Sequence, residues 1–283
     1  RRILCRRSLR ERDAPAAPAS TTVAARVHSK AQVRQLGGAG GAGTGKTLCA
    51  IDLAKMEAAS GKRVLLSCFN RKLEDYFRKK VDSDLGIKIM RVHDLCRELV
   101  EKAGMSSLLS GRPEDNKLYR EVYPAAAREA IKTLGADDSY DTIVMDEGQD
   151  IINDRYLDLY DDLLTGGIRE GTWAIFYDLH QDIFRGTEDK ALERLRNTRP
   201  FIHELKVNCR NTLDIANIAG CVSGIDPIKN KAVKGLAPDL LWYQEDEEQC
   251  DQISRTIAEW LDNGIGLDQI VVLSRRKLEN SAL

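Results

Sequence analysis

Residues 40–47 read Gly-Gly-Ala-Gly-Thr-Gly-Lys-Thr and fit the pattern G-x-x-x-x-G-K-[ST]. Glycines in such a stretch let backbone N–H groups turn inward around phosphate oxygens, where side chains would block the approach. An apolar stretch precedes it and a helical pattern follows, so the positive end of a helix would face the bound anion. The spacing therefore predicts a phosphate-binding loop. The alternative, a flexible Gly-rich linker, does not require this spacing or this context.

The predicted loop contains Gly40, Gly41, Ala42, Gly43, Thr44, Gly45, Lys46 and Thr47. Lys46 would reach the β- and γ-phosphates of ATP, and the Thr47 hydroxyl would bind Mg²⁺. A second stretch completes such a site, because the apolar residues 142–145 run directly into Asp146 and Glu147. Asp146 would hold Mg²⁺, and Glu147 would polarise the attacking water as general base. Alone, an acidic pair is more often a solvated face.

Outward from these two stretches, strand and helix patterns alternate along the chain. Strands are predicted over 32–36, 63–68, 87–92, 142–145 and 173–177, and helices over 46–60, 71–80, 94–103, 118–134 and 154–164, with Pro124 expected to kink or split its helix. This alternation predicts an α/β fold, a P-loop NTPase (RecA-like) parallel sheet with helices on both faces. Further strands at 204–207, 240–243 and 269–273, with helices at 213–222 and 246–261, predict the start of a second RecA-like domain.

The expected domains are a disordered basic tail or linker over 1–31, an ATP-binding domain over 32–202 and an incomplete second RecA-like domain over 203–283. The composition, 42% hydrophobic and 31% charged, is typical of a soluble globular protein. No apolar run approaches the ~20 residues of a membrane helix, and no secretory signal is seen, so we expect no membrane partner and a cytoplasmic location. The net charge of −1 does not indicate nucleic acid, and the oligomeric state stays open.

Six stretches, among them the two described above, resemble in order the motifs of superfamily 1 helicases of the UvrD/Rep type. Asp146-Glu147-Gly148-Gln149-Asp150 is similar to the D-E-x-Q-D box of that family. The others are residues 42–47 (its P-loop wording), 68–71 (motif Ia), 92–96 (the T-F-H-x-L-C stretch), 177–181 (motif III) and 208–211 (motif IV). Residues 270–274 resemble a strand of the second motor domain. The wording is closest to the helicase part of nuclease-related-domain proteins, over about residues 32–283.

The resemblance implies an ATP-dependent DNA helicase or translocase that couples ATP hydrolysis to single-stranded DNA. RNA is the alternative nucleic-acid partner. Gln181 would sense the γ-phosphate, and Arg210 would reach it across the cleft between two domains. Phe69 would stack on a base, while Asn70 and His93 would contact backbone or base. Taken alone, Phe69 would more often be core, His93 a half-buried histidine and Arg210 a surface arginine.

The sequence also departs from this family. Tyr177 and Cys209 stand where the family usually has Gly and Tyr, and no convincing adenine-reading glutamine precedes the loop. The late motifs that complete a second motor domain are expected after Leu283. Two alternatives therefore remain: a P-loop ATPase that does not act on nucleic acid, and a nucleotide-binding fragment without turnover. Whether single-stranded DNA stimulates ATP hydrolysis discriminates among the three.

Overall fold

A computed structural model of the chain describes residues 2–6, 34–110, 115–135, 138–178, 189–224, 234–235 and 237–272. The chain divides into two compact units: residues 17–210 form the larger one, and residues 1–16 together with 211–283 form the smaller one. Among the described residues, no helix combines the length and the apolarity that spanning a bilayer requires.

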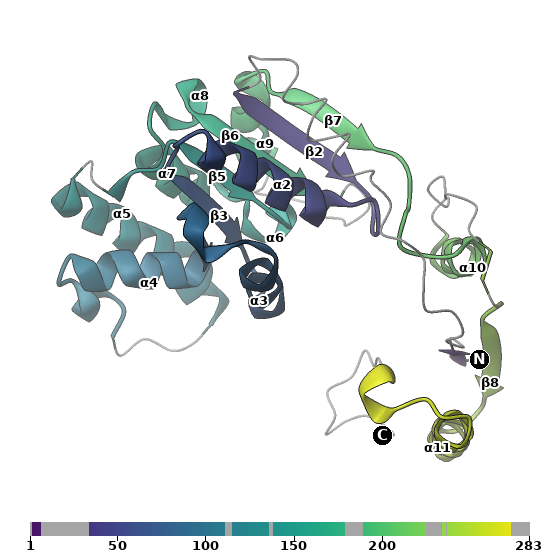
Figure 1. The fold of residues 1–283 in the computed structure, drawn as a ribbon. Coiled ribbons are helices and arrows are strands. Elements are labelled where there is room, and N and C mark those ends of the chain that lie inside the picture. The colour runs from purple at the N-terminus through teal and green to yellow at the C-terminus, as the bar shows by residue number, and fades with distance from the viewer. Residues whose placement is uncertain are drawn as a thin grey trace. The chain divides into compact units, whose positions relative to one another are not determined.

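The larger unit is built on a six-stranded sheet in which every pair of neighbours is parallel (Figure 1). The strand order is β4-β3-β5-β6-β2-β7. The strands are β2 (Gln35–Gly40), β3 (Val64–Cys68), β4 (Lys88–Arg91), β5 (Thr142–Met145), β6 (Thr172–Tyr177) and β7 (Phe201–Leu205). Parallel strands end at the same edge of a sheet, so the residues that follow them are brought together.

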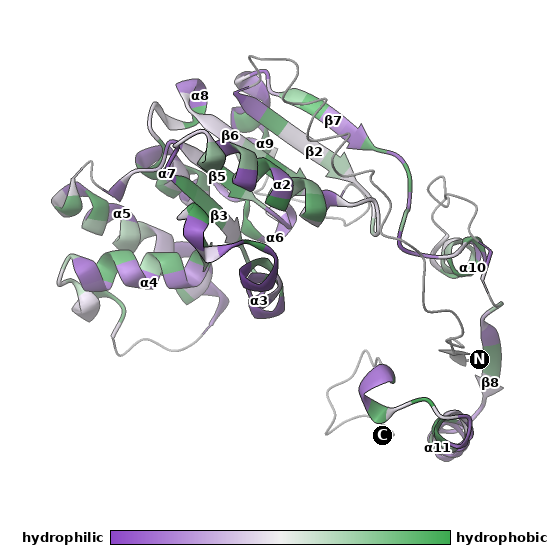
Figure 2. Cartoon of the chain, viewed as in Figure 1, coloured by the Kyte–Doolittle hydropathy of each residue, from purple (hydrophilic) through white to green (hydrophobic). Residues whose placement is uncertain are grey.

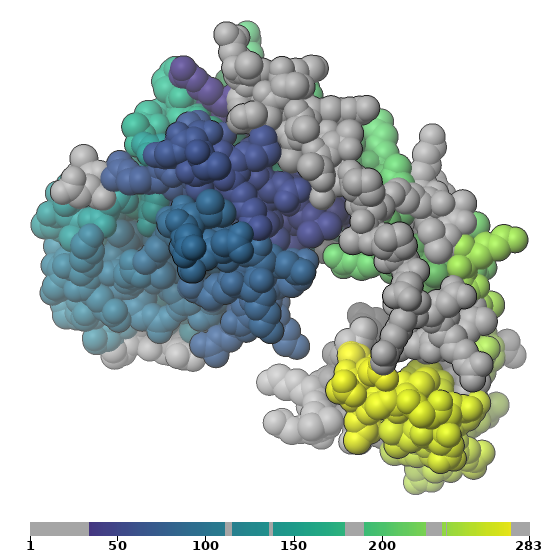
Figure 3. All heavy atoms as spheres, viewed as in Figure 1, coloured from purple at the N-terminus to yellow at the C-terminus, as the bar shows by residue number. Residues whose placement is uncertain are grey.

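Helices cover both faces of this sheet. They are α2 (Lys46–Ala59), α3 (Arg71–Lys80), α4 (Val92–Lys102), α5 (Tyr123–Leu134), α6 (Gly148–Ile151), α7 (Asp154–Leu163), α8 (Gly167–Glu170) and α9 (Asp189–Asn197). Short 3₁₀ turns lie at Ser83–Leu85 and Ser106–Leu108, and a π-helical turn lies at Leu118–Val122. Figure 3 shows α2 and α3 forming part of the visible surface of this unit.

Alternate residues of the central strands enter two separate apolar clusters. In β5, Ile143 packs with α4, α5 and α7, whereas Val144 packs with α2 and α3. In β6, Ile175 and Phe176 divide in the same way. Successive side chains of a strand point to opposite faces, so strands buried on both faces carry continuous apolar runs. Figure 2 shows the hydrophilic residues gathered on the outer helices, most plainly on α3. The predicted α/β fold with helices on both faces is thus confirmed.

Most predicted elements form within a few residues of the expected bounds, but β2 does not. It runs over Gln35–Gly40, where residues 32–36 were predicted, and so takes in the first glycines. A Cβ on Gly37 would lie 2.5 Å from Ile202 Cδ1, and one on Gly38 would lie 2.3 Å from Phe176 Cδ1. These glycines therefore allow the neighbouring strands to pack closely against β2. The sequence prediction treated them as loop residues because glycine is common in loops.

The expected break at Pro124 is confirmed in a particular form. The π-helical turn Leu118–Val122 leads into α5, and Pro124 occupies the first turn of that helix. Proline has no N–H to donate to the preceding turn, so the regular α-helical hydrogen bonds cannot run through this point.

The smaller unit differs more from the prediction. Arg2–Arg6, expected to be part of a disordered tail, forms β1 and pairs antiparallel with β8 (Asp239–Tyr243). Helices α10 (Leu213–Ser223) and α11 (Asp246–Asp262) lie close to the expected bounds. The strand predicted over 269–273 is wrong for the described residues: Leu267–Gln269 is a 3₁₀ turn, and Val271 is 76% exposed with no neighbouring strand described.

The expected boundary after residue 202 is also wrong. Residues 201–205 form β7, an edge strand of the parallel sheet that pairs with β2 from Leu36↔Phe201 to Gly40↔Leu205. The division between the units falls after Arg210. A strand that begins a new domain and one that closes the previous sheet have the same apolar pattern, so sequence alone could not place this boundary.

Candidate nucleotide-binding site

The predicted phosphate loop joins the end of β2 to the start of α2. Gly43 and Gly45 have φ angles of 80° and 94°, which side chains rarely adopt, so both glycines are required by the backbone. The Thr44 hydroxyl donates to Gly41 O at 2.8 Å and closes the loop on itself. The positive end of α2 begins directly after Gly45 and faces the space within the loop.

Lys46 is buried at this loop, with 7% of its surface exposed. Its Nζ donates to Gly40 O at 2.8 Å and to Gly41 O at 3.0 Å. It also forms an ion pair with Asp178 Oδ2 at 3.5 Å. Asp178 directly follows β6, so the lysine is held between the loop and the neighbouring strand end. Its ammonium group therefore has charge and hydrogen-bond partners that a bound phosphate would replace.

Asp146 follows β5 and has 0% of its surface exposed. Its Oδ1 accepts the Glu147 N–H at 3.0 Å, whereas its Oδ2 has no hydrogen-bond partner among the described residues. Burial is the main cause that raises the pKa of this carboxyl to about 6, and the nearby Thr47 hydroxyl opposes that shift. Mg²⁺ is coordinated by oxygen ligands, commonly one or two carboxylates or hydroxyls together with phosphate oxygens. Asp146 Oδ2 and the neighbouring Thr47 hydroxyl are ligands of this kind. Asp146 and Thr47 therefore fit the predicted metal.

Glu147 adopts a left-handed backbone conformation, with a φ angle of 52°. Its side chain accepts a hydrogen bond from Gln149 Nε2. The other end of the same amide, Gln149 Oε1, accepts the Asp178 N–H at 3.1 Å. The residues after β5 and β6 are thus joined by one buried side chain. Asp178 had no predicted role, although its position directly after a predicted strand at this edge could have indicated one.

The stretch 208–210 lies against the same loop. The Cys209 N–H donates to Gly43 O at 2.9 Å, and Asn208 Oδ1 accepts the Arg210 N–H at 3.0 Å. A Cβ on Gly43 would lie 2.5 Å from Asn208 Oδ1 and 3.0 Å from Arg210 Cβ. Arg210 therefore belongs to the same unit as the loop. The resemblance to helicases had implied that it would reach the loop from a second domain, across a cleft. Gln181 lies outside the described residues.

The residues predicted to contact nucleic acid lie after β3 and β4. Phe69 is 40% exposed, and its ring meets that of His93 edge-on with centroids 5.0 Å apart. His93 in turn packs against Tyr119 at 4.8 Å. Asn70 accepts the Lys72 N–H at 2.8 Å and caps α3, so it has a structural role here.

We define the aromatic cluster as Phe69, His93, Tyr119, Tyr123 and Tyr156. Their ring contacts with His93 lie between 4.8 and 6.3 Å. Burial, together with the nearby charges of Arg91 and Arg97, lowers the pKa of His93 to about 4. His93 is therefore uncharged at neutral pH and suits stacking better than pairing with a phosphate. Sequence reasoning missed the tyrosines, although Tyr119 and Tyr123 are four residues apart in a predicted helix.

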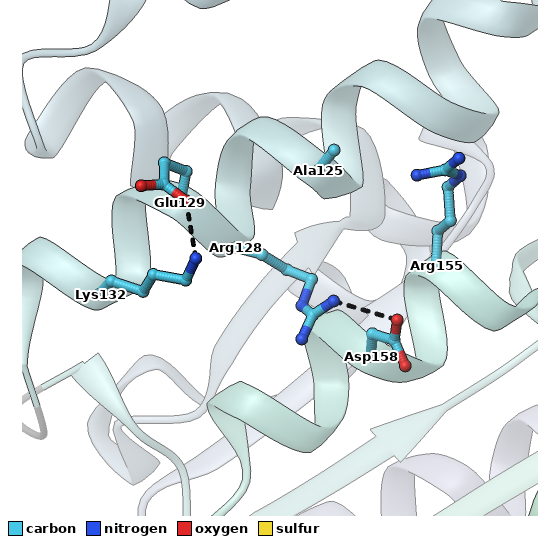
Figure 4. Close-up of a pocket in the computed structure, with 6 residues that line it drawn as sticks. All are labelled: Ala125, Arg128, Glu129, Lys132, Arg155 and Asp158. Atoms are coloured by element: carbon cyan, nitrogen blue, oxygen red, sulfur yellow. Dashed lines mark hydrogen bonds and ion pairs between the residues drawn. The ribbon is translucent and has the colours of Figure 1, made fainter.

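A separate surface pocket of about 180 Å³ lies between α5 and α7. Figure 4 shows Arg128 of α5 directed toward Asp158 of α7, with Lys132 and Glu129 paired beside them. Arg128 also bonds Asp162 at 2.6 Å. Arg128 thus joins α5 to α7, whereas the Lys132–Glu129 pair lies within α5. None of the residues that line this pocket belongs to the phosphate loop.

The β2–loop–α2 unit, with an acidic strand end on the same sheet, gives this chain the fold and phosphate-loop geometry of P-loop nucleotide-binding proteins. No protein-family model and no curated protein matches the sequence.

Three solved structures are similar to this chain over part of its length. AMPPCP-bound DnaA from Aquifex aeolicus has 15% sequence identity and a TM-score of 0.35, and the match covers 66% of this chain and 44% of that one. A DNA replication initiation factor has 15% identity and a TM-score of 0.38, and the match covers 67% of this chain and 47% of that one. Bacteroides Pif1 bound to ssDNA has 14% identity and a TM-score of 0.36, and the match covers 74% of this chain and 46% of that one. This chain spans less than half the length of each. At such identities and overlaps these likenesses carry no functional argument.

Proposed function

We propose that this chain is an ATP-hydrolysing motor of the superfamily 1 helicase type, which couples turnover to single-stranded DNA. The observation that carries the proposal is the arrangement at one sheet edge: Lys46 and Asp146 are buried at the phosphate loop, and the Phe69–His93 ring pair follows the neighbouring strands. The order of motif-like stretches supports the same reading. The smaller unit would be the start of a second RecA-like domain.

In the proposed mechanism, the glycine loop and the positive end of α2 bind the phosphates of ATP. The Lys46 ammonium group leaves its ion pair with Asp178 and binds phosphate oxygens instead. Asp146 and Thr47 would hold Mg²⁺, which, when bound, neutralises charge on the phosphates. Glu147 takes a proton from the attacking water, while Arg210 and Gln181 contact the γ-phosphate. Phe69 stacks on a base of the single strand.

The test is ATP hydrolysis by the full chain with and without single-stranded DNA, and with RNA in a parallel series. We expect Lys46→Ala to abolish tight ATP binding or turnover, because the phosphates lose their buried cation. Glu147→Gln should keep binding and lower turnover about 10²- to 10⁴-fold, the usual contribution of a general base. Normal turnover in either variant would remove that residue from the mechanism.

The coupling to nucleic acid is tested with Phe69→Ala. Loss of one stacked base, about 1–3 kcal/mol, should raise the DNA concentration that gives half-maximal stimulation at least about fivefold. Leu108→Ala is a matched control, because Leu108 is 37% exposed and lies outside the aromatic cluster. Turnover that responds to neither DNA nor RNA would favour an ATPase with another partner, and binding without turnover would favour a nucleotide-binding fragment.

A further inference from the structure

Gln149 lies on α6, directly after the acidic strand end, and only 5% of its surface is exposed. A glutamine amide has a donor end and an acceptor end, and here the two ends serve different elements. Its Nε2 donates to Glu147 Oε2, and its Oε1 accepts the Asp178 N–H at 3.1 Å. The side chain thus spans from the residue after β5 to the residue after β6.

The residue that Gln149 holds has an unusual backbone conformation. Glu147 has a positive φ angle, which costs free energy for a residue with a side chain and persists only where the surroundings impose it. Such backbone strain is concentrated at functional sites. The hydrogen bond from Gln149 fixes the carboxylate in one direction, because the amide is itself anchored at its other end. A general base must be held close to its productive geometry to be effective.

The same amide connects this carboxylate to the phosphate loop. Asp178, whose N–H binds Gln149, pairs through Oδ2 with Lys46 Nζ at 3.5 Å. Three contacts in series therefore join Glu147 to the lysine that would bind the phosphates. The side chain of Gln149 thus links the Glu147 carboxylate to the Asp178–Lys46 ion pair at the loop.

Resting on the proposed function, we propose that Gln149 is a positioning residue for Glu147. It directs the carboxylate through Nε2 and ties that direction to the Asp178–Lys46 pair through Oε1. A role confined to filling the core would make different demands: it would need the volume and the Asp178 bond, but not the donor.

Gln149→Glu separates these roles when its new carboxyl is ionised, because the carboxylate keeps an acceptor for the Asp178 N–H and loses the donor to Glu147. The new carboxylate is buried beside that of Glu147, so we expect this variant to melt at a lower temperature than the wild type. Its kcat is therefore measured below its melting temperature and above the pH at which the new carboxyl ionises, where it should bind a fluorescent ATP analogue within about threefold of the wild type. Its kcat should fall about tenfold to a hundredfold, the usual effect of a displaced catalytic group. Gln149→Met, which removes both hydrogen bonds at similar volume, should lose at least as much.

A double-mutant cycle completes the test. In a Glu147→Gln background, Gln149→Glu should cause no further loss of kcat, since the residue it positions is already inactive. A further loss of the same size would overturn the proposal, and so would a wild-type kcat in the single Gln149→Glu variant. A wild-type chain that does not hydrolyse ATP would overturn the proposed function and this inference together, whereas wild-type turnover that is insensitive to Gln149 would overturn the inference alone.

Discussion

The His93 ring is enclosed by other aromatic rings, and this surrounding determines its response to acid. Burial, with Arg91 and Arg97 nearby, lowers its pKa from 6.5 to about 4. In the unfolded chain His93 binds a proton as the pH falls through 6.5, whereas in the folded chain it does not until about pH 4. Its contribution to stability is therefore full above pH 6.5 and is lost progressively between pH 6.5 and 4.

We expect His93→Phe to lose less stability than the wild type over that interval, because phenylalanine keeps the ring contacts and cannot bind the proton. Urea denaturation at a series of pH values from 7 to 4 measures this. Other titrating groups contribute equally to both chains, so the difference between the two curves isolates His93. Parallel curves would show that His93 titrates normally in the folded protein.

At the same scale, the sequence predicted the residue types of the nucleotide site better than their contacts. The loop spacing identified Lys46 and Thr47, because a phosphate imposes that spacing on any such loop. The pairing of Lys46 with Asp178 and the bond from Cys209 N to Gly43 O depend on which strand ends are neighbours. That is a property of the sheet order, which no local pattern contains.

Among the elements, α2 and β5 are joined by a buried polar contact. Glu57, near the end of α2, accepts from the Thr142 hydroxyl at 2.8 Å and from Lys62 Nζ at 2.6 Å. Both Glu57 and Thr142 are buried. Removing one partner of a buried pair leaves the other unsatisfied, which costs more than the bond itself contributes.

Glu57→Ala should therefore lower the free energy of unfolding by about 1–3 kcal/mol. Glu57→Gln keeps an acceptor for Thr142 and should lose less. Adding Thr142→Val to Glu57→Ala should restore part of the loss, because no hydroxyl is then left without a partner. Chemical denaturation of the wild type, Glu57→Ala, Glu57→Gln, Thr142→Val and the double variant tests this. Strictly additive losses for Glu57→Ala and Thr142→Val would mean that the contact does not couple the helix to the strand.

Element prediction succeeded where a period or a breaker residue was present and failed where tertiary contacts decide. The helix at 71–80 and the strand at 142–145 have the predicted bounds, because their apolar patterns are clear. Gly37 and Gly38 looked like loop residues, yet they lie in a central strand whose neighbours leave no room for a Cβ. Arg2–Arg6 was expected to be disordered, but it pairs with β8 near the other end of the sequence, and no local pattern indicates so distant a partner.

At the scale of the whole molecule, the two units differ in how much apolar surface they bury. The larger unit contains both apolar clusters and all six parallel strands. In the described part of the smaller unit, the buried apolar residues are Ala216, Tyr243 and Ile253. Burial of apolar surface is the main driving force of folding. The larger unit therefore has what an independent domain needs.

We expect a fragment of residues 17–210 to fold alone and to bind an ATP analogue within about threefold of the full chain, a difference under ~0.7 kcal/mol. Every described residue of the nucleotide site lies within that fragment, Arg210 included. Circular dichroism and a nucleotide titration would show this, with Lys46→Ala in the same fragment as the control. A fragment that aggregates, or binds only when residues 211–283 are restored, would contradict it.

The hydrogen bonds within the glycine loop have a thermodynamic consequence. Thr44 Oγ1 and Cys209 N already fix the backbone of Gly41 and Gly43. A loop ordered during folding loses little conformational entropy when an anion arrives. Calorimetry should then show no entropic penalty of the size that ordering a free loop would cause.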